Sequence, residues 1–144
     1  HNRGMSCALE PGHPNALAPG KRPMHTIIPG MLFKDGRVRM SFGVMGGHYQ
    51  AMGQAHLIAK VIDYGIDVQS ALDLPRLFPL PGTRTVEVES GIPAETVAGL
   101  RRRGFDVVPT GYPIGGGQAI WIDWVHGTLI GGSDPRKDGC ALGY

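Results

Sequence analysis

The stretch "FKDGRVRMSFGVMGGHYQ", residues 33–50, contains in order a turn, a strand, a glycine pair and the start of a helix. Asp35-Gly36 lies between two apolar runs, which is the strongest local signal for a β-hairpin. From Arg37 to Val44, apolar residues alternate with polar ones, so one face of this strand is expected to be buried. The segment therefore predicts a hairpin whose second strand leads through a glycine turn into a helix.

The segments on either side continue this mixture of strands and helices. Apolar residues recur at helical spacing over 48–64, and Gly65 follows in a position where helices commonly end. Asp67 is expected to cap a short helix that runs to Asp73. Mixed helices and strands with antiparallel hairpins indicate an α+β fold. The other expected elements are strands at 26–33, 37–44, 85–90, 105–110 and 118–124, a strand after His126-Gly127, a helix between Ser90 and Gly104, and a loop over 75–82.

Composition and charge exclude several classes of protein. With 144 residues, of which 42 % are apolar and 18 % charged, the chain suits one globular domain with a core. Its net charge of +2 is too small to indicate a nucleic-acid partner or an anionic membrane. No apolar run is long enough to span a membrane, and the first residues lack the pattern of a signal peptide. Because the chain does not begin with methionine, its location in the cell is left open.

Cysteine and histidine usage gives no indication of a metal site. Cys7 and Cys140 are the only cysteines and lie near opposite ends of the chain, so two unrelated thiols are the simpler interpretation and a disulfide is the alternative. Zinc sites need Cys and His at close spacing, and the six histidines are scattered. No metal is therefore expected.

The first part of the chain has the composition of a loop. Residues 1–23 are rich in Gly, Pro and Asn and are expected to form an ordered, irregular loop. Such a long loop before the first strand is uncommon inside a compact domain. The chain is therefore expected to be the C-terminal part of something larger.

Four segments occur in a characteristic order: "PGHPNALAPGKRPMHTIIPG", "FGVMGGHYQ", "VIDYGIDVQSALDLPR" and "GGSDPRKDGCALGY". Together they resemble the γ-glutamyltransferase family of N-terminal-nucleophile (Ntn) hydrolases, and residues 1–144 match the C-terminal portion of its small subunit. The resemblance implies part of an αββα sandwich, an antiparallel sheet with helices packed on it, incomplete without the upstream segment. It also implies a precursor that cuts itself into a large and a small subunit. The new N-terminal threonine would be the nucleophile, with its own α-amino group as the base, and no cofactor is implied.

The Gly46-Gly47 pair is the candidate catalytic feature. In the family that the chain resembles, the paired glycines of this loop place backbone N–H groups over the reacting carbonyl as an oxyanion hole. A side chain at either position would crowd the substrate or exclude the required backbone angles. The helix that follows directs its positive end to the same place. Without the flanking motifs, the pair would be interpreted as a packing turn between a strand and a helix.

Candidate substrate-binding residues come from the same resemblance. Where classical members carry two serines that help hold the substrate carboxylate, this chain has His25 and Thr26. Thr26 keeps a hydroxyl group. His25 either donates a hydrogen bond or a charge to the substrate, or packs on the sheet, and both interpretations stay open. His48 and Tyr49, directly after the glycines, are candidate walls of the acyl pocket, and a helix start that is packed by an aromatic side chain is the alternative.

The N-terminal segment departs further from the family pattern. Classical members carry Gln and acidic residues that grip the glutamyl α-amino group where this chain has Gly4, Ser6 and Cys7. Without a carboxylate, a substrate ammonium would lose its ion-pair partner, which favours the acylase-like branch of the family over strict γ-glutamyl specificity. Arg3 is a candidate partner for a substrate carboxylate, and a surface position is the alternative.

Three polar residues are expected to support the fold rather than to react. Gln118 matches a polar position of the family and is interpreted as structural. Asp134 and Arg136, within "SDPRKDG", are expected to form an ion pair that closes the fold.

The sequence as a whole predicts part of a γ-glutamyltransferase-like hydrolase or acyltransferase acting on γ-glutamyl or similar amides, such as glutathione-like substrates. The expected partners are the large subunit, the remainder of the small subunit and a small-molecule amide, with no nucleic acid and no membrane. No threonine of this chain lies in the nucleophile's motif, so the chain alone is expected to be inactive. The alternatives are an acylase for glutaryl-type amides and a non-catalytic module that binds a partner or a small molecule.

Overall fold

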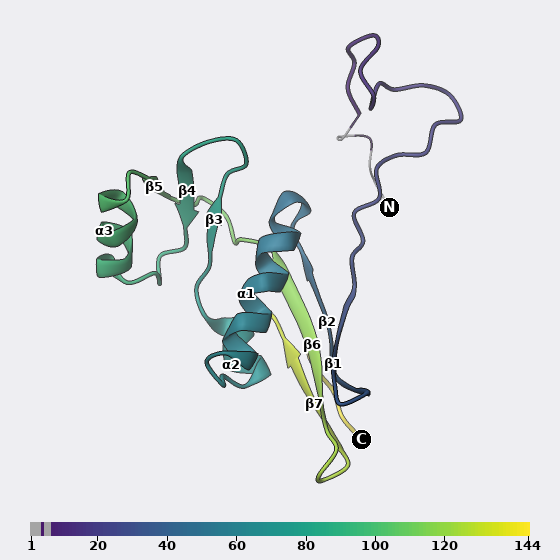
Figure 1. The fold of residues 1–144 in the computed structure, drawn as a ribbon, viewed down its shortest axis with the longest axis vertical. Coiled ribbons are helices and arrows are strands. Elements are labelled where there is room, and N and C mark those ends of the chain that lie inside the picture. Colours follow the sequence, from purple (N-terminus) through teal and green to yellow (C-terminus); the bar gives the residue numbers. More distant parts are fainter. Residues whose placement is uncertain (1–3, 5–6) are drawn as a thin grey trace.

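A main antiparallel sheet organises the chain (Figure 1). The computed structural model describes residue 4 and residues 7–144. Helices α1 and α2 cover one face of the main sheet, whose strand order is β1-β2-β6-β7. The expected α+β architecture with an antiparallel sheet and helices packed on it is confirmed. The elements are β1 (Gly30–Lys34), β2 (Arg37–Met45), α1 (Gln50–Ile62), α2 (Val68–Asp73), β6 (Gly116–Asp123) and β7 (Thr128–Ser133).

The hairpin between β1 and β2 forms where the sequence predicts it. Asp35 and Gly36 both have positive φ angles, 53° and 73°, as the tight two-residue hairpin turn requires. However, β1 begins at Gly30 rather than at residue 26. Pro29, just before it, has no N–H to donate to a strand ladder. The predicted strand over 26–33 is therefore wrong at its start, and residues 26–29 lie outside the sheet.

The core lies between β2 and the two helices. Met40, Phe42 and Val44 alternate along β2 and are almost fully buried, as the alternation predicts. They pack in one cluster with Leu57 of α1 and Leu72 of α2. Each such buried side chain contributes roughly 1.5–3 kcal/mol, so the strand that leads into the glycine turn is firmly held.

The predicted helix over 48–64 begins later and ends earlier than expected. Gly47–Tyr49 form a 3₁₀ turn, and α1 covers Gln50–Ile62. Gly65, with a φ angle of 65°, lies just past the end of α1, where a residue without Cβ is favoured. Asp67 then caps α2, as predicted, because its carboxylate accepts a backbone hydrogen bond of 3.0 Å.

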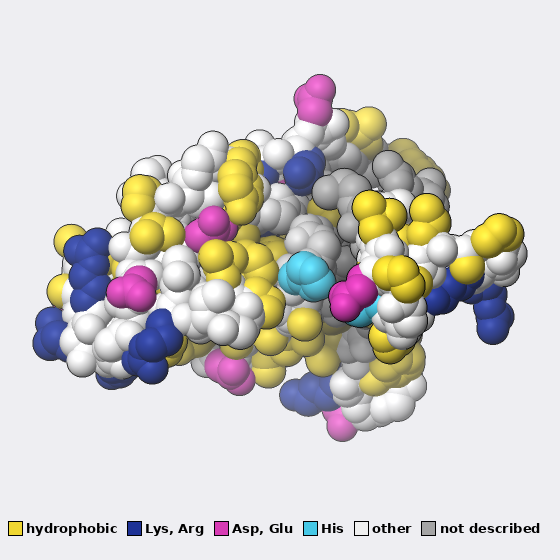
Figure 2. Space-filling view, turned by 90° about the horizontal axis from the view of Figure 1, so that it is seen from above, with side chains coloured by type: hydrophobic (Ala, Val, Ile, Leu, Met, Phe, Trp, Pro, Cys, Tyr) yellow, Lys and Arg dark blue, Asp and Glu magenta, His cyan; other side chains and the backbone are white. Residues whose placement is uncertain are grey.

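A second, smaller sheet is only partly predicted by the sequence. Its strand order is β3-β4-β5, and β4 pairs with β5 in parallel. The loop predicted over 75–82 in fact contains β3, an edge strand in which Pro79 is tolerated. Lys and Arg side chains gather at this end of the molecule (Figure 2). The elements are β3 (Leu77–Pro79), β4 (Thr85–Val88), α3 (Ala94–Arg102) and β5 (Asp106–Pro109).

The N-terminal segment is irregular, as predicted. Residues 7–29 belong to neither sheet, and the first part of the segment extends away from the rest of the fold (Figure 1). Cys7 and Cys140 are both free thiols. Within residues 4 and 7–144, no helix has the length and apolar character needed to cross a membrane. The same residues include no group of three or more Cys, His, Asp or Glu side chains placed to hold a metal ion.

The face of the main sheet opposite the helices, here called the open face, exposes apolar side chains. Met31, Met45, Ile120 and Leu129, one from each strand, are between 46 % and 69 % exposed. Arg39 lies on the same face, and its Nε atom is buried without a hydrogen bond to any described residue. The open face thus exposes an apolar side chain from every strand and includes a buried guanidinium nitrogen without a hydrogen-bond partner among the described residues.

Candidate functional site

The Gly46-Gly47 pair forms the turn between β2 and the helix. Gly46 has a φ angle of 141° and a ψ angle of 25°, and Gly47 has a φ angle of 60°. Residues with side chains rarely adopt these conformations. A Cβ atom on Gly46 would also lie 3.1 Å from the Cα atom of Gly115, whereas one on Gly47 would meet open space. Position 46 therefore needs glycine for both angle and room, whereas position 47 needs only a residue that accepts a left-handed angle.

Among the described residues, the carbonyl groups of Gly46 and Gly47 accept hydrogen bonds, whereas their amides donate none. The Tyr49 N–H donates to the Gly46 carbonyl at 3.1 Å. Gln50 donates to the Gly47 carbonyl through its backbone N–H and, at 3.3 Å, through its Nε2. In the part of the chain that the structure describes, the N–H groups of Gly46 and Gly47 donate to no other residue. The turn therefore carries two backbone donors that have no partner in residues 4 and 7–144.

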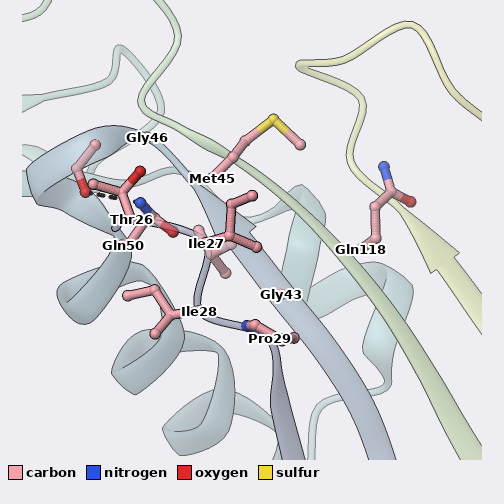
Figure 3. A pocket seen from close by; sticks show the side chains of 11 residues that line it. Thr26, Ile27, Ile28, Pro29, Gly43, Met45, Gly46, Gln50 and Gln118 are labelled. Carbon is pink, nitrogen blue, oxygen red and sulfur yellow. Dashed lines mark hydrogen bonds between the residues drawn. The ribbon is translucent and has the colours of Figure 1, made fainter. Parts of the chain in front are cut away.

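A cavity of about 420 Å³ adjoins the turn (Figure 3). One side is the extended segment 26–29, which Gln54 of α1 holds by donating to the Ile28 carbonyl at 2.5 Å. The other side is the end of β2 with the glycine turn. None of the described residues that line the cavity is charged, so it presents aliphatic groups, amides and one hydroxyl. They are Thr26, Ile27, Ile28, Pro29, Gly43, Val44, Met45, Gly46, Gly47, Gln50 and Gln118.

The predicted site residues do not all meet at this cavity. The Gly46-Gly47 pair and Thr26 line it. His25 and His48 are exposed and do not line it. Arg3 lies outside the described residues. The binding roles of His25, His48 and Arg3 stay predictions.

Several lining residues are missed by reasoning from the sequence. Met45 continues the alternation of β2 on the open face, and Gln50 begins α1 directly after the turn, so both positions follow from the element boundaries. Ile27 and Ile28 have the composition of a buried strand, and no local signal places them beside a cavity. Gln118, interpreted from the sequence as structural, also lines the cavity.

A network of charged side chains joins the two sheets close to the site. Arg76 and Asp134, 4 % and 1 % exposed, form a buried ion pair. Asp134 also accepts the Gly117 N–H at 2.7 Å. Arg136 binds both carboxylate oxygens of Glu89, at 2.7 and 2.6 Å. The predicted ion pair of Asp134 with Arg136 is confirmed at 3.2 Å. The network therefore fixes the start of β6, which pairs with the end of β2.

The network keeps its carboxylates ionised. Burial alone would raise the pKa of Asp134, but hydrogen bonds from the Arg136 and Gly117 amides and the Arg76 charge together hold that pKa below its usual value. Burial likewise opposes ionisation of Glu89, and hydrogen bonds from Arg136 and from backbone amides outweigh it and lower the pKa. Hydrogen bonds to Glu89 raise the pKa of Arg136 above its ordinary value. These groups are therefore suited to structural support rather than to proton transfer.

Comparison with known proteins gives a consistent result. A family profile described as Gamma-glutamyltranspeptidase matches residues 1–144. The chain is 36 % identical to a glutathione hydrolase-like YwrD proenzyme of Bacillus subtilis. It is 37 % identical to an oxamate amidohydrolase proenzyme of Klebsiella pneumoniae. Each match covers 99 % of this chain and 28 % of the relative, so the chain spans little more than a quarter of the length of these proteins.

Solved structures share the fold. The crystal structure of a cephalosporin acylase from Bacillus halodurans matches with a TM-score of 0.84 and 41 % identity, over 99 % of this chain and 27 % of that one. A γ-glutamyltranspeptidase of Helicobacter pylori matches with a TM-score of 0.82 and 26 % identity, over 94 % of this chain and 79 % of that one.

Proposed function

Because the chain belongs to the γ-glutamyltranspeptidase family, we propose that it forms the oxyanion-hole wall of an amide-cleaving active site in a longer precursor. The observation that carries this proposal is the Gly46-Gly47 turn, whose two amides are unpaired among the described residues and whose residues line a cavity. When a nucleophile adds to an amide carbonyl, the oxygen becomes negatively charged. Donors already aimed at that oxygen stabilise the charge without having to reorganise.

The chemistry is divided between this chain and the rest of the precursor. The nucleophile is assigned to a threonine outside residues 1–144, as the sequence resemblance implies, with its α-amino group taking the hydroxyl proton. The N–H groups of Gly46 and Gly47 donate to the oxyanion. Thr26, which lines the same cavity, is assigned to substrate binding. The tetrahedral adduct then breaks its C–N bond, the leaving amine takes the proton back from the α-amino group, and the resulting acyl-enzyme ester is resolved by water or an amine.

The uncharged lining of the cavity beside the glycine turn favours contact with the neutral part of an acyl group. No charged side chain lines the cavity among the described residues. The sequence resemblance also implies that Gly4 and Cys7 stand where classical members carry residues that hold an α-ammonium group. These features favour γ-glutamyl-like acyl groups that lack the ammonium, such as glutaryl, as the second candidate beside γ-glutamyl itself. The acylase and amidohydrolase relatives support a broad class of amides.

The full-length protein that carries this chain is expected to release p-nitroaniline from γ-glutamyl-p-nitroanilide, glutaryl-p-nitroanilide or both. The ratio of the two kcat/KM values, measured by absorbance, decides between the two acyl groups, since only the first carries the α-ammonium. Acetyl-p-nitroanilide is the control for cleavage without acyl recognition. A processed protein that cleaves neither acidic probe faster than the acetyl control contradicts the proposal.

The open face of the main sheet is the surface that we assign to the remainder of the precursor. Its exposed apolar side chains and the buried Arg39 Nε, which has no partner among the described residues, favour covering groups that include a hydrogen-bond acceptor. The relatives extend well beyond the segment that this chain matches, so such covering segments are available in proteins of this family.

Residues 1–144 produced alone are expected to self-associate and to show no amide cleavage, because the open face would be exposed to water and the nucleophile would be absent. Size-exclusion chromatography with light scattering measures the association. Replacing two apolar residues of this face, Met31→Lys with Leu129→Lys, should reduce it. A monomeric chain that melts cooperatively would instead favour the non-catalytic module.

A further inference from the structure

The side chain of Tyr49 lies in a space made by three glycines. The residue is only 2 % exposed. A Cβ atom on Gly46 would lie 3.2 Å from the Tyr49 Cβ, one on Gly53 would lie 2.6 Å from the ring Cε1, and one on Gly115 would lie 2.6 Å from the ring Cδ1. The backbones of the glycine turn, of α1 and of the loop before β6 approach the Tyr49 side chain this closely only because these three residues lack side chains.

The turn is enclosed between the Tyr49 side chain and the backbone of Gly115. A Cβ atom on Gly46 would lie 3.1 Å from the Gly115 Cα, and one on Gly115 would lie 2.6 Å from the Met45 carbonyl oxygen. Groups packed at this density cannot shift without displacing their neighbours. The position of the turn is therefore fixed sterically from two sides.

The backbone of Tyr49 also sets the direction of one amide. The Gly46 carbonyl and the Gly47 N–H belong to one planar trans peptide, in which they point in opposite directions. The hydrogen bond of 3.1 Å from the Tyr49 N–H holds that carbonyl. It therefore also fixes the direction in which the Gly47 N–H points.

Two further contacts anchor the Tyr49 ring. It packs edge-to-face on Phe78 with ring centroids 5.4 Å apart and an angle of 81° between the planes. The Arg76 guanidinium lies 6.0 Å from the ring centroid, and Arg76 is itself paired with Asp134. The ring thus connects the glycine turn to the charged network.

The hydroxyl group of Tyr49 makes none of the contacts that hold the glycine turn. Its oxygen is buried and has no hydrogen-bond partner among the described residues. Burial raises the pKa of the phenol above its usual value, so the group stays protonated in the pH range of most enzymes. The features that matter are the ring and the backbone N–H.

We infer that Tyr49 is a positioning residue, whose ring and backbone amide hold the Gly46-Gly47 turn at the place and angle that the oxyanion requires. The inference rests on the proposed function of that turn.

The test compares Tyr49→Leu, Tyr49→Phe and Leu57→Ala in the processed full-length protein, with the two p-nitroanilide probes. Tyr49→Leu should lower kcat by about 10-fold to 100-fold with KM within about twofold, because a displacement near 1 Å can cost about 100-fold in rate. Tyr49→Phe keeps the ring and should retain kcat within about twofold. Leu57→Ala empties a buried position of the same core, 3 % exposed, and should lower the melting temperature while leaving kcat unchanged.

Two results would overturn the inference: a loss of kcat in Tyr49→Leu no larger than in Leu57→Ala, or an equal loss in Tyr49→Phe. The variant Gly47→Pro distinguishes a failure of the positioning role of Tyr49 from a failure of the oxyanion role of the turn. If Gly47→Pro lowers kcat and Tyr49→Leu does not, the positioning role fails alone; if neither lowers it, the oxyanion assignment fails as well. Should Tyr49→Leu not fold, Tyr49→Met leaves a smaller cavity and serves in the same comparison.

Discussion

Gly47→Pro in the full-length protein is expected to lower kcat by about 100-fold to 1,000-fold and to leave KM within about threefold. Proline has no backbone N–H, so the substitution removes one donor of the proposed oxyanion hole. That donor acts on charge that develops during the reaction, and substrate binding in the ground state does not depend on it. Steady-state kinetics on γ-glutamyl- and glutaryl-p-nitroanilide give both parameters.

Gly47→Asn is the matched control for this substitution. The φ angle of Gly47 is 60°, whereas proline fixes φ near about −65°, so proline also disturbs the turn. Asparagine keeps the N–H and is among the residues that accept left-handed angles, and a Cβ atom at this position meets open space. The Asn variant should keep most of its activity. Equal losses in the two variants would trace the effect to backbone shape and contradict the donor role.

Asp134→Ala is expected to lower the free energy of unfolding by about 3–5 kcal/mol, since removing one member of a buried ion pair leaves the other charge uncompensated. Arg76, 4 % exposed, would be the stranded charge, and the Gly117 N–H would lose its acceptor. Denaturant unfolding of the full-length protein measures the loss. Asp138→Ala is the control, because Asp138 is exposed and such surface changes stay within about 0.5 kcal/mol. Similar losses in both variants would refute the role given to the pair.

The same network predicts sensitivity to acid. The pKa values of Asp134 and Glu89 are lowered in the folded protein. A carboxylate of this kind contributes stability above its unfolded pKa and loses it as the pH falls through the folded pKa. Ordinary carboxyl pKa values are near about 4, so the melting temperature should be level above about pH 5 and fall below about pH 4. Asp134→Asn should flatten this fall, and an unchanged slope would count against the network.

Local signals predicted the elements whose formation depends on a few neighbouring residues. Asp35-Gly36 predicted the β1–β2 hairpin because its turn needs two positive φ angles. Asp67 predicted the start of α2 by its capping side chain. By contrast, β3 forms within 75–82 because it pairs with β4. The prolines of this segment predict a loop, and no local pattern indicates the pairing. The parallel pairing of β4 with β5 likewise depends on how α3 packs.

Only part of the candidate site can be predicted from the sequence. The Gly46-Gly47 pair was found through resemblance to a family, since its local sequence also fits a packing turn. The apolar isoleucines of segment 26–29 predict a strand, and only the position of the segment beside β2 makes it a cavity wall. The contact of Tyr49 with Gly115 joins residues far apart in the chain, and no local pattern predicts it.

Gly53 shows how such packing constrains the evolution of the protein. Alanine is favoured over glycine inside a helix by about 1 kcal/mol, yet a methyl group here would lie 2.6 Å from both the Tyr49 ring and the Val44 side chain. Helix α1 therefore keeps Gly53, the residue with its lowest helix propensity, beside the glycine turn. A larger residue at position 53 becomes acceptable only after its aromatic neighbour or the valine has become smaller, and a smaller neighbour alone leaves a void. Mutations at these positions are thus epistatic, and the order in which they arise decides which of them survive.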